Sequence, residues 1–240
     1  MFPLIILIAI FITVLVYLIS SKYSQSYKTD LLKKAVPILI GVAIGARLLS
    51  ALSLLSLTEN SFWYNLRFGG SVFYGGIIGG GLSLLILCKL NKQSFFDYSD
   101  VLVSLFPLGH AIGRIGCYLN GCCYGLKHSG FLSVPYVING ENTRVIPTWF
   151  IESFFCLLLF IYLHICCSTV IRGIRTSIYF IFYSIFRFFI EFLRGDSIRG
   201  NWGVLSTSQI ISIFALFFGL IALIISLRNK NRNFLIAKET

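Results

Sequence analysis

Residues 207–227 read TSQIISIFALFFGLIALIISL and contain no charged side chain. An α-helix rises about 1.5 Å per residue, so a segment of this length crosses the roughly 30 Å of hydrocarbon in a lipid bilayer. Comparable apolar runs recur along the 240-residue chain. The sequence therefore predicts an all-α integral membrane protein with about seven transmembrane helices, at about 2–19, 35–57, 71–90, 99–117, 148–170, 176–194 and 207–227.

The composition supports this fold class. Hydrophobic residues make up 57% of the chain and charged residues only 12%, about half the charged share of a typical soluble domain. No polar or Pro/Ser-rich linker divides the sequence, so we expect a single polytopic domain over residues 1–240. A net charge of +11 would suggest nucleic acid as the partner of a soluble protein. Here the basic residues lie between apolar runs, which is typical of cytoplasmic loops and argues against a nucleic-acid partner.

The positions of the lysines and arginines predict the orientation. The first, third and fifth gaps and the C-terminal tail carry most of them: Lys22, Lys28, Lys33, Lys34, Lys89, Lys92, Arg172, Arg175, Arg228, Lys230, Arg232 and Lys238. The other gaps carry fewer: Arg67, Lys127, Arg144, Arg194 and Arg199. By the positive-inside rule, the N-terminus is outside and the C-terminus is cytoplasmic. The fourth run contains Pro107 among several glycines, which indicates a bent or partly re-entrant span.

Charged residues inside the expected spans are candidates for a functional site, because a charge at the centre of a membrane helix costs about 2.5–3.5 kcal/mol or more. These residues are Arg47, Arg114, Glu152, Arg187 and Glu191. Tyr183, Arg187 and Glu191 are spaced by four and share one helix face, so Arg187 and Glu191 are expected to pair. Arg114 is expected to be unpaired, which leaves a surplus positive charge. Because guanidinium groups bind phosphate bidentately, we expect a lipid phosphate to bind there.

Glycine is concentrated in the segment 69–81, which reads GGSVFYGGIIGGG. Pairs spaced by four, such as Gly75 and Gly79, allow two helix backbones to pack closely. Gly69 and Gly70 precede the expected helix and are more suited to a close approach between backbone and ligand. No strand–helix unit surrounds these glycines, which excludes a dinucleotide-binding fingerprint.

The segment 113–125 reads GRIGCYLNGCCYG and lies where the fourth expected span leaves the membrane on the outer side. Its four glycines, with Arg114 and Asn120, indicate an irregular loop that binds an anion. One turn before Arg114 is His110, for which we favour a buried structural role over a catalytic one.

From these motifs, the chain resembles the bacterial prolipoprotein diacylglyceryl transferases over about residues 41–212. The segment 113–125 looks like the family signature G-R-x-x-N-F-x-N-G-E-x-x-G. The other matching stretches are Gly45-Ala46-Arg47, FYGGIIGG at 73–80, SFFDYSD at 94–100, Pro147 with Glu152, FYSIFRFFIEFLRGD at 182–196, and Gln209-Ile210-Ile211-Ser212.

This resemblance implies a function and a site. Such enzymes transfer the diacylglyceryl group of phosphatidylglycerol to the lipobox cysteine of a preprolipoprotein in the bacterial cytoplasmic membrane, with the active site toward the outer leaflet and without cofactor or metal. Arg114, Arg187 and Tyr74 are the expected catalytic residues. The expected phosphatidylglycerol-binding residues are Arg114, Asn120, Gly121, Gly125, Gly75, Gly76, Tyr183 and Glu191.

The sequence also departs from the family pattern. Tyr74 replaces a histidine that is frequently catalytic, while Cys117 and Cys122 replace the Asn and Glu of the signature. These departures leave open a paralogous transferase that uses phospholipid with another acceptor. Cys117, Cys122 and Cys123 at an oxidising face leave open a thiol-redox protein. A transporter or channel is disfavoured, because the embedded charges gather in the outer half of the membrane and do not line a through-path.

Overall fold

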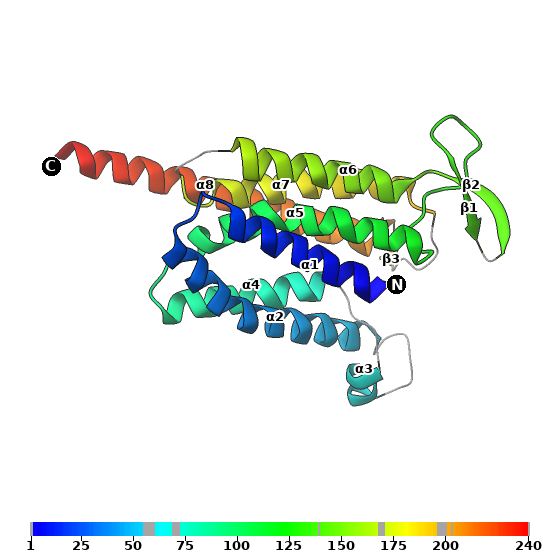
Figure 1. The fold of residues 1–240 in the computed structure, drawn as a ribbon, viewed down its shortest axis with the longest axis horizontal. Coiled ribbons are helices and arrows are strands. Elements are labelled where there is room, and N and C mark those ends of the chain that lie inside the picture. Colours follow the sequence, from blue (N-terminus) through cyan, green and yellow to red (C-terminus); the bar gives the residue numbers. More distant parts are fainter. Residues whose placement is uncertain are drawn as a thin grey trace. The chain divides into compact units, whose positions relative to one another are not determined.

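The computed structural model describes residues 2–54, 61–68, 73–138, 140–167, 171–195, 201–202 and 204–239. The chain forms two compact units, each described here by itself: Met1–Ile19 with Asp100–Thr240, and Ser20–Ser99. Both units are mostly helical (Figure 1). The predicted single domain remains a prediction.

The first unit contains five long helices. They are α1 (Phe2–Ile19), most of α5 (Phe95–Leu119), α6 (Thr148–Phe160), α7 (Ile174–Ile190) and α8 (Thr207–Glu239). A π-helical turn, η1 (Ile161–Cys166), extends α6, and a 3-10 turn, η2 (Glu191–Leu193), extends α7. The fourth span was expected to be bent or partly re-entrant. The helix α5 runs without interruption through Pro107, which does not support the re-entrant form, while the bend stays a prediction.

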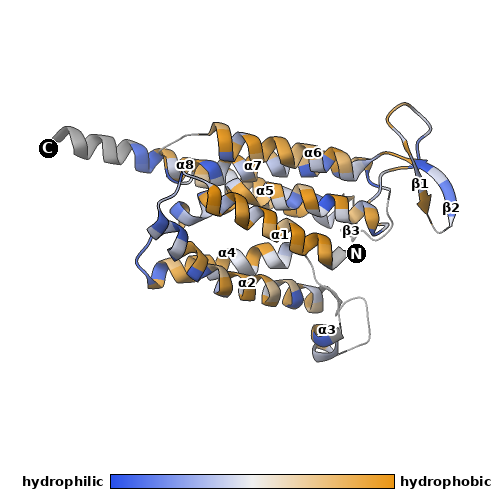
Figure 2. Ribbon diagram, in the orientation of Figure 1, coloured by the Kyte–Doolittle hydropathy of each residue, from blue (hydrophilic) through white to orange (hydrophobic). Residues whose placement is uncertain are grey.

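Two short hairpins also occur in this unit, so the all-α prediction was incomplete. The strands β1 (Val134–Ile138) and β2 (Glu141–Val145) pair antiparallel, as do β3 (Asn201–Trp202) and β4 (Leu205–Ser206). The sequence VPYVI of β1 alternates between half-buried and exposed positions, as expected of a strand with one covered face. Figure 2 shows β1 as hydrophobic and β2 as hydrophilic.

The second unit contains α2 (Gln25–Leu54), α3 (Phe62–Phe68) and α4 (Phe73–Leu90). Here α2 and α4 meet through glycines spaced by four. A Cβ on Gly75 would lie 2.3 Å from the backbone oxygen of Gly45, and one on Gly79 would lie 2.1 Å from that of Gly41. Both distances are far below van der Waals contact, so these positions require glycine, which confirms the predicted close packing of helices.

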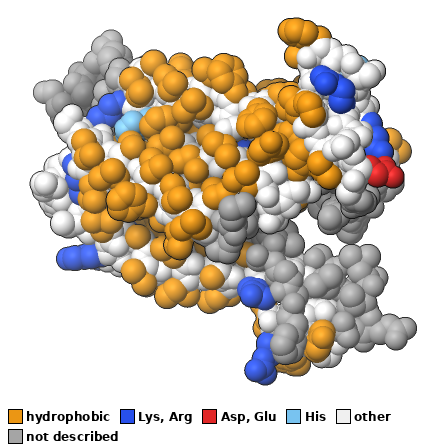
Figure 3. Space-filling view, turned by 45° about the vertical axis from the view of Figure 1, so that its right-hand side comes forward, with side chains coloured by type: hydrophobic (Ala, Val, Ile, Leu, Met, Phe, Trp, Pro, Cys, Tyr) orange, Lys and Arg blue, Asp and Glu red, His pale blue; other side chains and the backbone are white. Residues whose placement is uncertain are grey.

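The structure bears out the membrane class. Within the described residues, five helices are long and apolar enough to cross a bilayer: Gln25–Leu52, Phe95–Leu119, Thr148–Cys166, Ile174–Leu193 and Thr207–Lys230. Leu4–Ile19 and Tyr74–Leu90 are shorter apolar helices at two further expected spans. Large hydrophobic side chains such as Phe11, Phe154 and Phe214 are about two-thirds exposed, which suits contact with lipid rather than water. In Figure 3 hydrophobic side chains cover most of the helical surface in view, and Lys and Arg lie at its margins.

Two polar caps fix the helices that border the site in the first unit. The carboxylate of Asp100 on α5 accepts hydrogen bonds from the backbone N–H groups of Gly173 and Thr176 (2.7 and 2.8 Å) and from the Thr176 hydroxyl (2.6 Å), which caps the start of α7. At the start of α8, the Ser206 hydroxyl accepts from the Gln209 N–H while the Gln209 side chain accepts from the Ser206 N–H. This reciprocal pair is a capping box.

Candidate functional site

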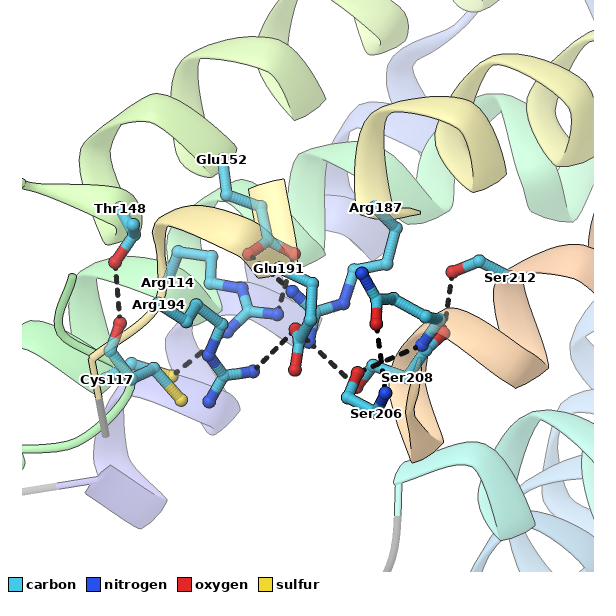
Figure 4. Close-up of polar contacts among 12 residues, drawn as sticks. Arg114, Cys117, Thr148, Glu152, Arg187, Glu191, Arg194, Ser206, Ser208 and Ser212 are labelled. Atoms are coloured by element: carbon cyan, nitrogen blue, oxygen red, sulfur yellow. Dashed lines mark hydrogen bonds and ion pairs between the residues drawn. The ribbon is translucent and has the colours of Figure 1, made fainter. Parts of the chain in front are cut away.

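The centre of the candidate site is the carboxylate of Glu152 on α6. Its Oε1 atom lies 2.6 Å from Nη2 of Arg114 and accepts a hydrogen bond from the Tyr183 hydroxyl at 3.0 Å. Nε2 of His110 lies 3.5 Å from the same oxygen, and Nη1 of Arg187 lies 3.8 Å from Oε2. Side chains from α5, α6 and α7 therefore converge on one carboxylate that is 2% exposed (Figure 4).

A second carboxylate extends this network along α7. Oε2 of Glu191 lies 2.9 Å from Nη2 of Arg187 and 3.5 Å from Nη1 of Arg194. The same Nη2 atom of Arg187 donates a hydrogen bond to the Ser208 hydroxyl on α8 at 3.1 Å. The spacings of four and three place these charges on one face of α7 and its 3-10 extension, as predicted. Arg187 thus bridges two carboxylates and two helices.

The network carries more positive than negative charge. Arg114, Arg187 and Arg194 share two carboxylates, Glu152 and Glu191, and all five side chains are largely buried. Nε of Arg114 is buried and has no hydrogen-bond partner among the residues that the structure describes. Because a buried donor without a partner costs about 1–3 kcal/mol, this guanidinium is suited to a further acceptor. The charge surplus and the available donor both favour an anionic ligand.

Apolar packing holds the site helices in place. Leu159, Leu163 and Tyr179 form a buried cluster beneath the site. Tyr183 packs at its edge, and its ring centroid lies 5.6 Å from that of Tyr179 and 5.3 Å from that of His110. The rings of Phe155 on α6 and Phe186 on α7 stack at 3.9 Å. Rigid packing of this kind keeps Glu152 and Arg187 in fixed positions.

The loop after α5 is ordered by its backbone. Gly125 donates its N–H to the Ile146 oxygen at 3.1 Å, and Gly195 donates to the Tyr124 oxygen at 2.9 Å. A Cβ on Gly125 would lie 2.3 Å from that Ile146 oxygen, so close packing explains this glycine. Gly121 has a φ of 72°, a conformation that glycine adopts readily. Asn120 is exposed beside it.

Three thiols gather next to Arg114, one from the last turn of α5 and two from this loop. The Sγ atoms of Cys117, Cys122 and Cys123 lie within 4.8 Å of one another, and Nη1 of Arg114 lies 4.0 Å from Sγ of Cys117. None of the seven cysteines, all of which lie within the described residues, forms a disulfide, so no disulfide braces the loop. Burial raises the pKa of the Cys122 thiol. Thiols that exchange disulfides rapidly have lowered pKa values, so this environment does not favour the redox alternative.

The structure brings Arg114, Tyr183, Arg187 and Glu191 into one network. Tyr74, Gly75 and Gly76 lie on α4 in the second unit, as the embedded Arg47 does on α2. Gly75 packs against Gly45, and a Cβ on Gly76 would lie 3.2 Å from a methyl carbon of Val42. Gly69 and Gly70, expected to approach a ligand, lie outside the described residues.

One expectation about the charges needs correction. Arg114 was expected to be unpaired, but Glu152 pairs with it at 2.6 Å because α6 brings that carboxylate to α5. The surplus positive charge remains only because Arg194 joins the network. Glu152 was expected only as one of the embedded charges, without an assigned role in the site, and His110 was expected to be structural. The signal for Glu152 was present, since it was one of two acids inside the expected spans.

Fold and site together define a multi-pass membrane protein with an arginine–carboxylate network buried between its helices. A sequence model of the family described as prolipoprotein diacylglyceryl transferase matches residues 1–225. The chain belongs to this family.

Individual relatives carry related names. A phosphatidylglycerol–prolipoprotein diacylglyceryl transferase of Clostridium tetani is 33% identical over 202 residues, which are 82% of this chain and 81% of that protein. A protein of the same name from Clostridioides difficile is 36% identical over 170 residues, 70% of this chain and 66% of that protein. The protein named transferase 2 of Clostridium perfringens is 38% identical over 156 residues, 63% of this chain and 60% of the relative.

Proposed function

We propose that this chain transfers the diacylglyceryl group of phosphatidylglycerol to the lipobox cysteine thiol of preprolipoproteins and releases glycerol phosphate. The names of its relatives support this activity. The observation that carries the proposal is the buried network of three arginines and two carboxylates with its available donor on Arg114. The expected substrate is an anionic lipid whose phosphate becomes the leaving group.

The chemistry is a displacement at a glycerol carbon. A carbon–sulfur bond forms while the bond between that carbon and the phosphate oxygen breaks, and the bond electrons remain on the departing glycerol phosphate. The acceptor thiol loses its proton to the medium. Negative charge grows on the leaving phosphate, so fixed donors aimed at it lower the barrier. Arg114 and Arg187 are the groups that we assign to this task.

The carboxylates hold these arginines in position. Glu152 contacts both Arg114 and Arg187, and Glu191 contacts Arg187, so neither guanidinium needs to reorganise when the lipid binds. Tyr183 donates to Glu152 and fixes its orientation. We assign Tyr74 a part in orienting the phosphate, and Asn120, Gly121, Gly125, Gly75 and Gly76 a part in binding the lipid.

We further propose seven membrane spans in the bacterial cytoplasmic membrane, with the N-terminus outside, the C-terminus inside and the site toward the outer leaflet. The distribution of basic residues supports this orientation. In the same frame, Arg114 near the C-terminal end of α5 and Glu191 just after α7 both lie toward the outer ends of their helices.

The test is a transfer assay with purified protein, phosphatidylglycerol vesicles and a lipobox peptide. We expect peptide that carries a diacylglyceryl thioether, together with glycerol phosphate, and restored lipoprotein maturation in cells depleted of their own transferase. A peptide with serine in place of the lipobox cysteine should stay unmodified. If vesicles release glycerol phosphate while the cysteine peptide remains unmodified, the acceptor is a different molecule.

Cysteine variants separate this function from the redox alternative. The acceptor supplies the reacting thiol, so Cys117→Ala, Cys122→Ala and Cys123→Ala should each retain transfer activity per molecule. If these variants lose all activity at normal abundance while Arg114→Ala stays active, the transferase function is rejected in favour of the redox alternative.

A further inference from the structure

The thiol cluster beside Arg114 has a geometry that the transferase reaction does not use. Its three Sγ atoms lie within 4.8 Å of one another. In a tetrahedral zinc–thiolate site the metal–sulfur bonds are about 2.3 Å long, so bound sulfur atoms lie about 3.8 Å apart. Side-chain movements of about 1 Å would bring all three thiols to one metal ion.

The backbone around the cluster is held in the conformation that makes the thiols converge. Cys123 has a φ of 60°, a region in which non-glycine residues cost of order 1–3 kcal/mol and which is enriched at functional sites. Gly121, with its φ of 72°, turns the chain two residues earlier. These two positions let Cys122 and Cys123 fold back toward Cys117 on the last turn of α5.

Side chains from α6 and β1 fix this loop from outside. The Trp149 indole donates to the Cys122 oxygen at 2.7 Å, and the Thr148 hydroxyl donates to the Cys123 oxygen at 2.8 Å. The Tyr136 hydroxyl donates to the Tyr118 oxygen at 3.0 Å. The site is therefore built before a ligand arrives, which reduces the entropy lost on binding.

We propose that Cys117, Cys122 and Cys123 bind one soft, thiophilic metal ion of the Zn²⁺ and Cd²⁺ class. Thiolate sulfur selects such ions over hard cations. Three protein ligands leave a fourth position of a tetrahedral ion open to water or another small ligand. Cys117 lies on the last turn of α5, and Cys122 and Cys123 lie next to each other in the loop that follows. This spacing matches no common zinc motif, and the sequence predicted no metal.

The charge of the neighbouring Arg114 also suits a metal ion bound by three thiolates. Three thiolates around a divalent ion carry a net charge of −1, and Nη1 of Arg114 lies 4.0 Å from Sγ of Cys117. A guanidinium at this distance offsets that charge in a partly buried setting. The occupied site would therefore draw on the same arginine that contacts Glu152.

The experiment titrates Cd²⁺ into the reduced full-length protein in detergent and follows the ultraviolet absorption of cadmium–thiolate bonds. We expect one ion per chain, and an affinity at least about tenfold lower in each of Cys117→Ser, Cys122→Ser and Cys123→Ser. Cys166→Ser is the matched control, because Cys166 is exposed and lies outside the cluster. Its affinity should equal that of the wild type.

A second measurement needs no variant. Alkylation of wild-type protein with and without Cd²⁺, read by mass spectrometry, should show protection of the three clustered thiols and continued reaction of Cys166. Equal protection of all cysteines, no cadmium–thiolate absorption, or unchanged affinity in Cys122→Ser would overturn the proposal. A reduced protein that binds no Cd²⁺ but forms a disulfide within the cluster in air would assign these thiols to redox chemistry instead.

Discussion

At the residue scale, Glu152 determines the positions of two of the three arginines in the site, Arg114 and Arg187. Its Oε1 atom contacts Arg114 and Tyr183, while Oε2 faces Arg187. One carboxylate thus holds two cations that would otherwise repel each other across a small distance. A hydrogen bond to a charged group contributes about 1.5–3 kcal/mol, so the orientation of Arg114 depends strongly on this partner.

Glu152→Gln tests this role. The amide keeps the shape of the side chain but removes its charge, so it should lower the rate of diacylglyceryl transfer about tenfold to a hundredfold, in line with that loss of 1.5–3 kcal/mol. The measurement is the turnover of lipobox peptide per folded molecule. Glu141→Gln, at an exposed position of β2, removes the same charge and should leave the rate unchanged. Wild-type turnover in Glu152→Gln would show that Glu152 does not orient the arginines.

Arginine cannot be replaced by lysine at the proposed phosphate site. Arg114→Lys and Arg187→Lys should each lower the rate of transfer by about 10²–10³-fold. An ammonium group cannot form the planar, bidentate contact with the phosphate. Each variant therefore loses one fixed hydrogen-bond donor to the negative charge that develops on the leaving phosphate. Arg172→Lys and Arg228→Lys lie outside the site and should be silent in the same assay. An Arg114→Lys protein with wild-type activity would remove Arg114 from the phosphate site.

Sequence reasoning identified the arginines and the pairing of Arg187 with Glu191, but not the partners that other helices supply. Charged residues are rare within the apolar runs, and this identifies Arg114, Arg187 and Glu191. A charge inside the membrane is energetically costly, so it is kept where it has a function. The pairing of Arg114 with Glu152 joins α5 to α6 across 38 residues, and the contact between Arg187 and Ser208 joins α7 to α8. No local spacing encodes such contacts, since they depend on how the helices pack. Serine is also too common for Ser208 to stand out.

At the scale of elements, apolar length predicted every long helix, because helices in a bilayer must satisfy their backbone groups internally. The boundaries were less well predicted. The helix α2 begins at Gln25, ten residues before the expected span, because its first turns are polar and lie outside the apolar run. The hairpins escaped prediction because five-residue strands in a loop produce only a short alternating pattern.

The cap on α7 gives a prediction at this scale. Asp100→Ala removes the acceptor of three hydrogen bonds at the start of the helix that carries Arg187. We expect the free energy of unfolding to fall by about 1–3 kcal/mol, as for the loss of a cap and the exposure of buried donors. Thermal unfolding in detergent measures it. Asp100→Asn retains one acceptor oxygen and should lose less, whereas equal stability of all three proteins would exclude a capping role.

At the scale of the whole molecule, the orientation in the membrane decides which side of the cell the site serves. The prediction depends on charge, because lysine and arginine are retained on the cytoplasmic side while the apolar spans insert in either direction. Five helices satisfy the length and hydropathy of a span, and Leu4–Ile19 and Tyr74–Leu90 are shorter. An odd total of seven places the two termini on opposite sides, whereas loss of either short helix as a span would place them on the same side.

Reporter fusions distinguish these topologies. A reporter that is active only outside the cytoplasm should work when inserted in 118–147 or in 195–206. The first of these segments contains the β1–β2 hairpin. The same reporter fused after Arg228 should be inactive, because α8 returns the chain to the cytoplasm. A fusion before α1 completes the set, since it is active only if α1 crosses the membrane in the expected direction. Reporter activity after Arg228 with no activity in 118–147 would show that the protein has the opposite orientation. Arg114, Glu152 and Arg187 would then lie toward the inner leaflet.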